Sequence, residues 1–99
     1  MPPLLATVAD DDLSVTACFS VHAHAEPGVM PRVLELFAKR GLVPSAWHSA
    51  IVGTNQAELA IEIQMRGLGR ELMDYIAGCL RQIAYVEVVL TSEKGGTSA

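Results

Sequence analysis

The hydrophobic periodicity of the chain changes from segment to segment, and this order constrains the fold more than any other feature. Apolar residues recur at every second position over 16–24, 57–65 and 86–90, which is typical of strands with one buried face. A further strand is predicted over 44–52, where Trp47 and Ile51 share one face and His48 and Val52 the other. Over 29–40 and 68–83 the spacing is helical instead. The predicted order is therefore strand, helix, strand, strand, helix, strand.

The residues between these segments favour the same division. Pro27 cannot donate a ladder hydrogen bond and Gly28 tolerates a positive φ, so the first strand should end there. Gly41 follows two basic residues, which is typical of a helix C-terminus. Residues 53–55, Gly-Thr-Asn, predict a turn that joins strands two and three into a hairpin.

Two right-handed β-α-β crossovers joined in this order predict an α+β fold. This is the ferredoxin-like βαββαβ sandwich, a four-stranded antiparallel sheet with two helices on one face and strands one and three in the centre. We expect residues 1–14 to form an N-terminal arm, 15–92 the domain and 93–99 a flexible C-terminal tail. The expected core comprises Phe19, Val21, Val33, Leu36, Phe37, Leu59, Ile61, Ile63, Leu72, Ile76, Val86, Val88 and Leu90.

The composition predicts more apolar surface than one small domain can bury. Apolar residues make up 51% of the 99 positions and charged residues only 18%, against a usual charged share of about 25%. We expect the surplus, including Ala46, Ala50, Ala60 and Val89 on or beside the uncovered sheet face, to be covered by a partner. A homodimer is the simplest arrangement.

Charge, cysteine content and run lengths exclude several classes of protein. The segment 15–92 has six basic and seven acidic residues, a net charge of −1, which argues against a nucleic-acid surface. Two cysteines are too few for a disulfide-stapled module, and we expect both to be buried as small apolar side chains. No apolar run approaches the roughly 18 residues of a membrane span. The N-terminus does not resemble a signal peptide, so a cytoplasmic location is expected.

No catalytic or cofactor-binding motif is present, so we predict neither an enzyme nor a cofactor. The uncovered sheet face nevertheless carries His22 and His24 of strand one, which should lie near Glu58 and Glu62 of strand three, with His48 beside them. Three interpretations remain open: polar residues hydrogen-bonded on a solvated or interfacial face, a pH-sensitive interface, and a metal site formed by His22, His24 and Glu62.

The run from Phe19 to Leu42 resembles the opening of an ACT domain. It has a strand, an acidic-Pro-Gly-apolar turn at Glu26-Pro27-Gly28-Val29 and a helix that ends in Arg40-Gly41. The resemblance covers about residues 16–91 and is greatest to the short regulatory (small) subunit of acetolactate synthase. It implies a non-catalytic regulatory domain that pairs with a second copy. Such a domain binds an amino acid at the interface, regulates the catalytic subunit of a biosynthetic enzyme, or does both.

The resemblance also implies a set of ligand-binding residues. These are Glu26, Pro27, Gly28, Val29, Met30 and Val43. The backbone N–H groups of Gly28 to Met30 would face the carboxylate of the ligand. Val43 stands where valine-sensitive regulatory subunits commonly have an asparagine, and its side chain offers no hydrogen bond. The alternative is a protein-interaction module without a small-molecule ligand.

Overall fold

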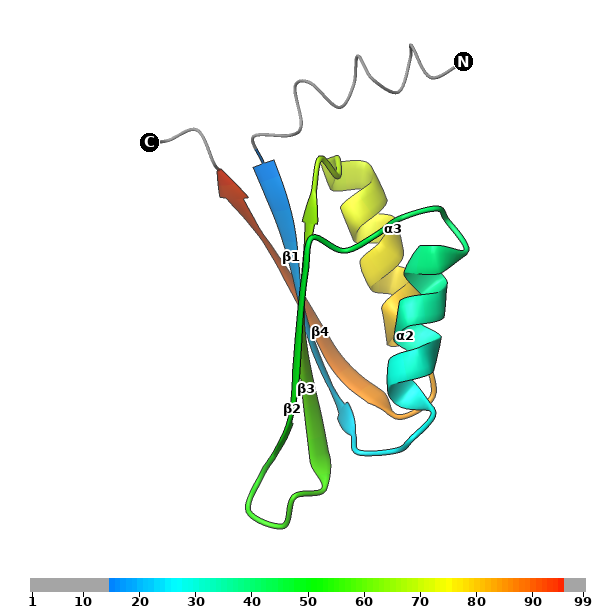
Figure 1. Cartoon of the computed structure of the whole chain (residues 1–99), viewed down its shortest axis with the longest axis vertical. Helices are drawn as coiled ribbons and strands as arrows, with labels where there is room; N and C mark the ends of the chain where they lie inside the picture. Colours follow the sequence, from blue (N-terminus) through cyan, green and yellow to red (C-terminus); the bar gives the residue numbers. More distant parts are fainter. Residues whose placement is uncertain (1–14, 96–99) are drawn as a thin grey trace.

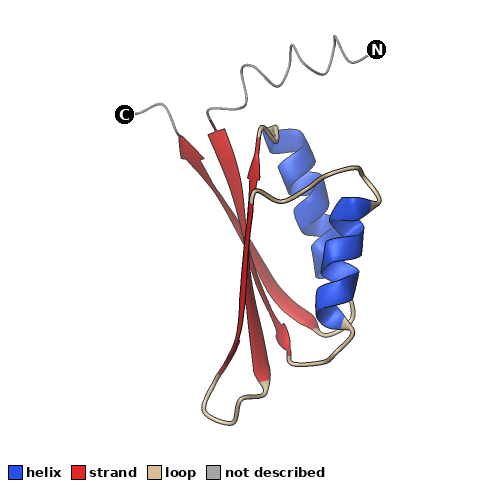
Figure 2. Cartoon of the chain, viewed as in Figure 1, coloured by secondary structure: helices blue, strands red, loops and turns tan. Residues whose placement is uncertain are grey.

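The computed structural model describes residues 15–95 of the chain and confirms the predicted order of elements. The elements are β1 (Val15–His24), α2 (Val29–Ala38), β2 (Ala46–Val52), β3 (Glu58–Arg66), α3 (Arg70–Arg81) and β4 (Val86–Gly95). All strand pairs are antiparallel and the sheet order is β2-β3-β1-β4. Both helices lie on one side of the sheet and the other side has no helix over it, which is the ferredoxin-like fold (Figures 1 and 2).

The core lies between the helices and the two central strands. Phe19 of β1 pairs with Ile63 of β3, and its ring meets that of Phe37 from α2 edge to face, with 5.7 Å between the centroids. The largest fully buried side chains are Phe19, Phe37, Ile61, Ile63, Ile76, Leu80, Val21, Val29 and Val33. The alternation of β1 and β3 therefore gives the buried face that the sequence predicts.

The alternation predicted for β4 is wrong. Val89 is buried, whereas Val88 and Leu90 are 44% and 60% exposed on the side without helices. The cause is a β-bulge: Val86 lies opposite Ala23 and Val89 opposite Val21, so three steps along β4 match two along β1. The extra residue reverses the faces of every side chain after it, while Val86 still packs against the core.

The buried face of α3 is also rotated from the predicted one. Met73, Ile76, Ala77 and Leu80 are buried at i, i+3, i+4 and i+7, whereas Leu72, expected in the core, is 40% exposed. Leu72 and Met73 are adjacent and both apolar, so a helix face that contains either of them satisfies the helical spacing. Docking against the sheet selects the face that contains Met73.

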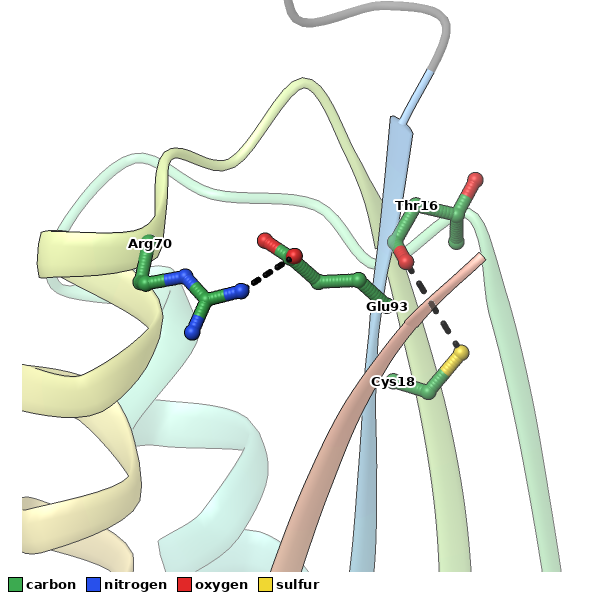
Figure 3. A network of polar contacts seen from close by, with 4 residues as sticks. All are labelled: Thr16, Cys18, Arg70 and Glu93. Atoms are coloured by element: carbon green, nitrogen blue, oxygen red, sulfur yellow. Dashed lines mark hydrogen bonds and ion pairs between the residues drawn. The ribbon is translucent and has the colours of Figure 1, made fainter. Parts of the chain in front are cut away.

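The last strand is longer than the sequence predicts. Residues 93–95, expected in the tail, continue β4. Arg70 Nη2 lies 2.9 Å from Glu93 Oε1, and this ion pair joins the start of α3 to the end of the strand (Figure 3).

The predicted arm over 1–14 lies outside the described residues. Cys18, whose Sγ is 3.9 Å from the carbonyl oxygen of Thr16, and Cys79 are free thiols, and the burial expected for both is only partial. Within residues 15–95, neither helix is long and apolar enough to cross a membrane.

Candidate functional site

The loop from β1 into α2 is a tight turn held by backbone hydrogen bonds, both within the loop and to the residue before β3. The N–H of Ala25 donates to the carbonyl of Ala57, and that of Glu26 to the carbonyl of His24. Gly28 is the N-cap of α2 with φ −80°, so the positive φ that its identity permits is not used. A Cβ at this position would lie 3.2 Å from Nη1 of Arg32, the mobile end of a long side chain.

The N-terminus of α2 offers fewer hydrogen-bond donors than predicted. The N–H of Val29 donates to the carbonyl of Glu26 at 3.1 Å, and the side chain of Val29 is fully buried in the core. Val29 therefore does not line an open site, contrary to expectation. Pro31 has no N–H. The first-turn amides left for an anionic ligand are those of Gly28 and Met30.

An apolar hollow of about 490 Å³ lies beside this helix end, and we call it the α2–β2 hollow. It is lined by Pro27, Met30, Pro31, Leu34 and Trp47, none of which carries a charge. Its volume falls within the range of about 300–1,000 Å³ that is usual for small-molecule sites. The hollow can receive an apolar group, and its lining supplies no acid, base or nucleophile.

The structure brings together only part of the predicted site. Pro27 and Met30 line the α2–β2 hollow, but Glu26 is exposed in the loop and Val43, 83% exposed between α2 and β2, does not line it. The sequence reasoning missed Leu34 and Trp47. The i, i+4 spacing of Met30 and Leu34 is the signal that places both on one side of α2.

The three histidines lie on the side of the sheet without helices, as predicted, and His24 lies opposite Glu58, one of the two carboxylates expected beside it. His22 lies between Ala60 and Val88, and Nε2 of His24 is 3.0 Å from Oε2 of Glu87. His48 lies opposite Glu62, whose carboxylate accepts a hydrogen bond from Ser20. In the described part of the chain no three His, Cys, Asp or Glu side chains are placed to hold a metal ion. The metal-site interpretation is therefore wrong for this face.

A second, charged hollow of about 260 Å³ lies between α2 and Ile83, which follows the end of α3. Nη2 of Arg40 donates to the Tyr75 hydroxyl at 3.3 Å, and this hydrogen bond raises the pKa of Arg40 above its ordinary value. The guanidinium also lies over the Tyr75 ring, 5.4 Å from its centroid. Lys39 pairs with Glu35 at 3.7 Å. Lys39 and Arg40 therefore already have partners at this exposed surface, and we assign the hollow no ligand.

Solved structures with the same fold have little sequence identity to the chain. The ACT domain from GTP pyrophosphokinase of Chlorobium tepidum superposes with a TM-score of 0.65 at 9% identity, covering 78% of this chain and 96% of that one. The C-terminal domain of the MgtC protein from Mycobacterium tuberculosis gives 0.67 at 10% identity, with 86% and 93% covered. The regulatory subunit of aspartate kinase from Thermus flavus gives 0.60 at 16% identity, with 81% and 52% covered. These likenesses show the fold.

No curated protein matches the sequence significantly. Residues 10–95, however, match the family described as ACT-like domain, which spans all six elements of the structure. Together with the sheet order and the two helices on one face, this match establishes that the chain belongs to the ACT-like domain family.

Proposed function

We propose that this ACT-like regulatory domain binds an apolar amino acid where two copies meet, and through that contact regulates a biosynthetic enzyme. The observation that carries the proposal is the α2–β2 hollow, an uncharged recess beside a helix N-terminus. Its lining of two prolines, Met30, Leu34 and Trp47 suits an aliphatic or aromatic side chain. The amides of Gly28 and Met30 would hold the ligand carboxylate and Glu26 its ammonium group.

The edges of the sheet support pairing of two copies through β2. On β4, the guanidinium of Arg81 donates to the carbonyl of Val89 at 2.8 Å and occupies part of that edge. Covering an edge in this way discourages strand pairing. At the β2 edge the neighbouring side chains of Met30 and Leu34 are exposed and apolar. Pairing of two β2 strands would extend the sheet and close both α2–β2 hollows against the partner.

The regulated enzyme is proposed from resemblance. The run over 19–42 resembles the short regulatory subunit of acetolactate synthase, and the solved structures of the same fold include a regulatory subunit of aspartate kinase. We propose that the chain acts beside such an enzyme in the cytoplasm. Adding the purified domain to an acetolactate synthase catalytic subunit should change its rate. No change in rate, and no co-purification from the source cells, would remove this enzyme as the target.

The ligand is testable by fluorescence because Trp47 is the single tryptophan and lines the hollow. Titration with each of the twenty amino acids should shift the Trp47 emission to the blue for an apolar one. At one hundred times Kd the ligand should stabilise the fold by about 2.7 kcal/mol, which raises the Tm by more than about 10 °C for a domain of this size.

Two matched variants distinguish an emission shift caused by binding in the hollow from one caused by binding elsewhere on the domain. Leu34→Asn should abolish the emission shift, whereas Leu72→Asn, at a comparably exposed position on α3, should leave it unchanged. If no amino acid changes either the emission or the Tm at millimolar concentration, amino-acid binding by this hollow is excluded.

One observation favours an alternative function without a small-molecule ligand. The lining of the hollow holds no charged side chain, and Val43 presents an 83% exposed apolar side chain on the loop before β2. An apolar residue of a partner protein could fill the same recess. In that case the domain co-purifies with an enzyme subunit, and Leu34→Asn weakens that contact while amino acids have no effect.

A further inference from the structure

A hollow of about 410 Å³, which we call the sheet hollow, lies on the side of the sheet opposite the helices. In Figures 1 and 2 no described element lies over this side. The residues that line the hollow come from three adjacent strands, β3, β1 and β4, and are Cys18, Ser20, Glu62, Leu90, Thr91 and Ser92. Its volume falls within the range of about 300–1,000 Å³ that is usual for small-molecule sites, so a small ligand fits it.

The sheet hollow forms because small side chains of β1 lie between longer ones of the neighbouring strands. Ser20 of β1 lies opposite both Glu62 of β3 and Leu90 of β4. Cys18, two residues earlier and therefore on the same face, lies opposite Ser92 of β4. Since β1 is a central strand, the longer side chains of Glu62 and Leu90 stand on either side of it. One wall of the hollow is therefore anionic and the other is apolar.

The carboxylate of Glu62 has no cationic partner among the described residues. It accepts a hydrogen bond from the Ser20 hydroxyl, and His48, opposite it on β2, forms no ion pair with it. On the described part of this face, the Lys and Arg residues are Arg66 and Lys94. Both are level with the residue of β1 four positions before Ser20, about 13 Å away at roughly 3.3 Å per residue. The sheet hollow therefore holds a negative charge that the described side chains leave without an opposite charge.

We propose that the sheet hollow binds a small organic cation, namely an ammonium group on a short alkyl chain. The ammonium group donates hydrogen bonds to the Glu62 carboxylate and to the hydroxyl oxygens of Ser20 and Ser92. The alkyl chain covers Leu90, whose side chain is 60% exposed although a solvated face of an antiparallel sheet is expected to be polar. An anion of the same size is disfavoured, because its charge would face that of Glu62. The anionic wall and the apolar wall together define the class of ligand.

The sheet hollow is separate from the α2–β2 hollow, and different residues report on the two sites. Trp47, the single tryptophan, lines the α2–β2 hollow on the helix side of the sheet, opposite the buried Ile63. Cys18 lines the sheet hollow, whereas the other cysteine, Cys79, lies on α3. Tryptophan emission therefore measures binding at one site and alkylation of Cys18 measures it at the other. The failure of either proposal leaves the other testable.

The first experiment measures how fast iodoacetamide alkylates each cysteine of the full chain, with mass spectrometry as the readout. At ten times its Kd, n-butylammonium should slow the alkylation of Cys18 about tenfold and leave that of Cys79 unchanged. Butan-1-ol and butyrate, which have the same number of carbon atoms, should slow it less. The proposal is wrong if either of them protects Cys18 as well as n-butylammonium does, or if n-butylammonium gives no protection at concentrations that leave the domain folded. Protection that depends on protein concentration and not on the amine would also overturn it, because another copy of the chain would then cover the hollow.

The second experiment tests the role of the carboxylate with two variants of β3. Glu62→Gln keeps the size of the side chain and an acceptor for Ser20 but removes the charge. The Kd of n-butylammonium, measured from the protection of Cys18, should rise about fivefold, because a hydrogen bond to a charged group is roughly twice as strong as a neutral one. Glu58→Gln removes the same charge four residues away on the same face, about 13 Å at roughly 3.3 Å per residue, and should leave the Kd unchanged. Equal Kd values for the two variants would show that Glu62 does not bind the cation.

Discussion

Two adjacent residues of α3 allow a direct test of how the helix docks on the sheet. Met73 is buried, whereas Leu72 is 40% exposed, although the spacing of apolar residues favours Leu72 as the core residue. Leucine and methionine have similar helix propensities, so replacement of either by alanine changes the intrinsic helix stability by nearly the same small amount. The difference between Met73→Ala and Leu72→Ala therefore reports the difference in burial.

The expected losses of stability follow from the atoms removed. Met73→Ala deletes three heavy atoms from the core, about 2.4 kcal/mol at about 0.8 kcal/mol each, and the cavity left behind raises the loss to about 3 kcal/mol. Leu72→Ala deletes the same number of atoms from a partly exposed site. Solvent fills the space there, so we expect a loss of about 1.4 kcal/mol. The two variants should differ by about 1.5 kcal/mol.

Urea unfolding followed by circular dichroism measures this difference. With an m-value of about 1–3 kcal/mol/M, the midpoint of Met73→Ala should lie about 0.5–1.5 M below that of Leu72→Ala, with m unchanged. Both variants must be measured at one protein concentration, because the proposed pairing of two copies would make the apparent stability concentration-dependent. An equal or larger loss for Leu72→Ala would show that α3 docks with the face predicted from the sequence.

Two further predictions concern the backbone. Gln56 has φ 56° in the turn before β3. A left-handed conformation costs an L-residue about 1–2 kcal/mol, so Gln56→Gly should raise the free energy of unfolding by about 0.5–1 kcal/mol even after the entropic cost of glycine. Thermal unfolding will show this, and Thr54→Gly in the same turn should give no gain. Arg81→Met leaves the carbonyl of Val89 without its hydrogen bond and should cost about 1 kcal/mol. It also uncovers the β4 edge, so light scattering should detect more aggregation than for Arg81→Lys; equal behaviour would show that Arg81 does not protect the edge.

The parts of the fold that the sequence predicts depend on local pattern. β1 and β3 alternate without interruption, so their helix-covered face follows from period. Their pairing follows from the order of elements, and the hairpin to β2 from the turn residues 53–55. The side chains that β4 exposes cannot be predicted from period, because the bulge depends on the backbone of the junction before the strand. There Tyr85 has φ 76° and its carbonyl accepts a hydrogen bond from the N–H of His24. Nothing in the residue types over 85–90 specifies this geometry.

The candidate site was predictable only where it lies within one stretch of sequence. Pro27 and Met30 belong to the loop and first turn that resemble an ACT domain, and both line the α2–β2 hollow. Trp47 reaches the same hollow from a strand that begins eight residues after α2 ends. Its proximity to Leu34 is a product of the crossover between helix and sheet. Spacing along the chain cannot predict such a contact.

The bulge in β4 also explains where the apolar surplus of the composition lies. Without the extra residue, Val88 and Leu90 would point toward the helices and Val89 would be the apolar side chain outside. With it, two large apolar residues lie on the side of the sheet without helices, while the core still receives Val86 and Val89. A strand that had to face water after the bulge would be expected to carry polar residues at 88 and 90. Both positions nevertheless carry aliphatic side chains, so the bulge moves part of the apolar surplus of the composition from the core to the side of the sheet without helices.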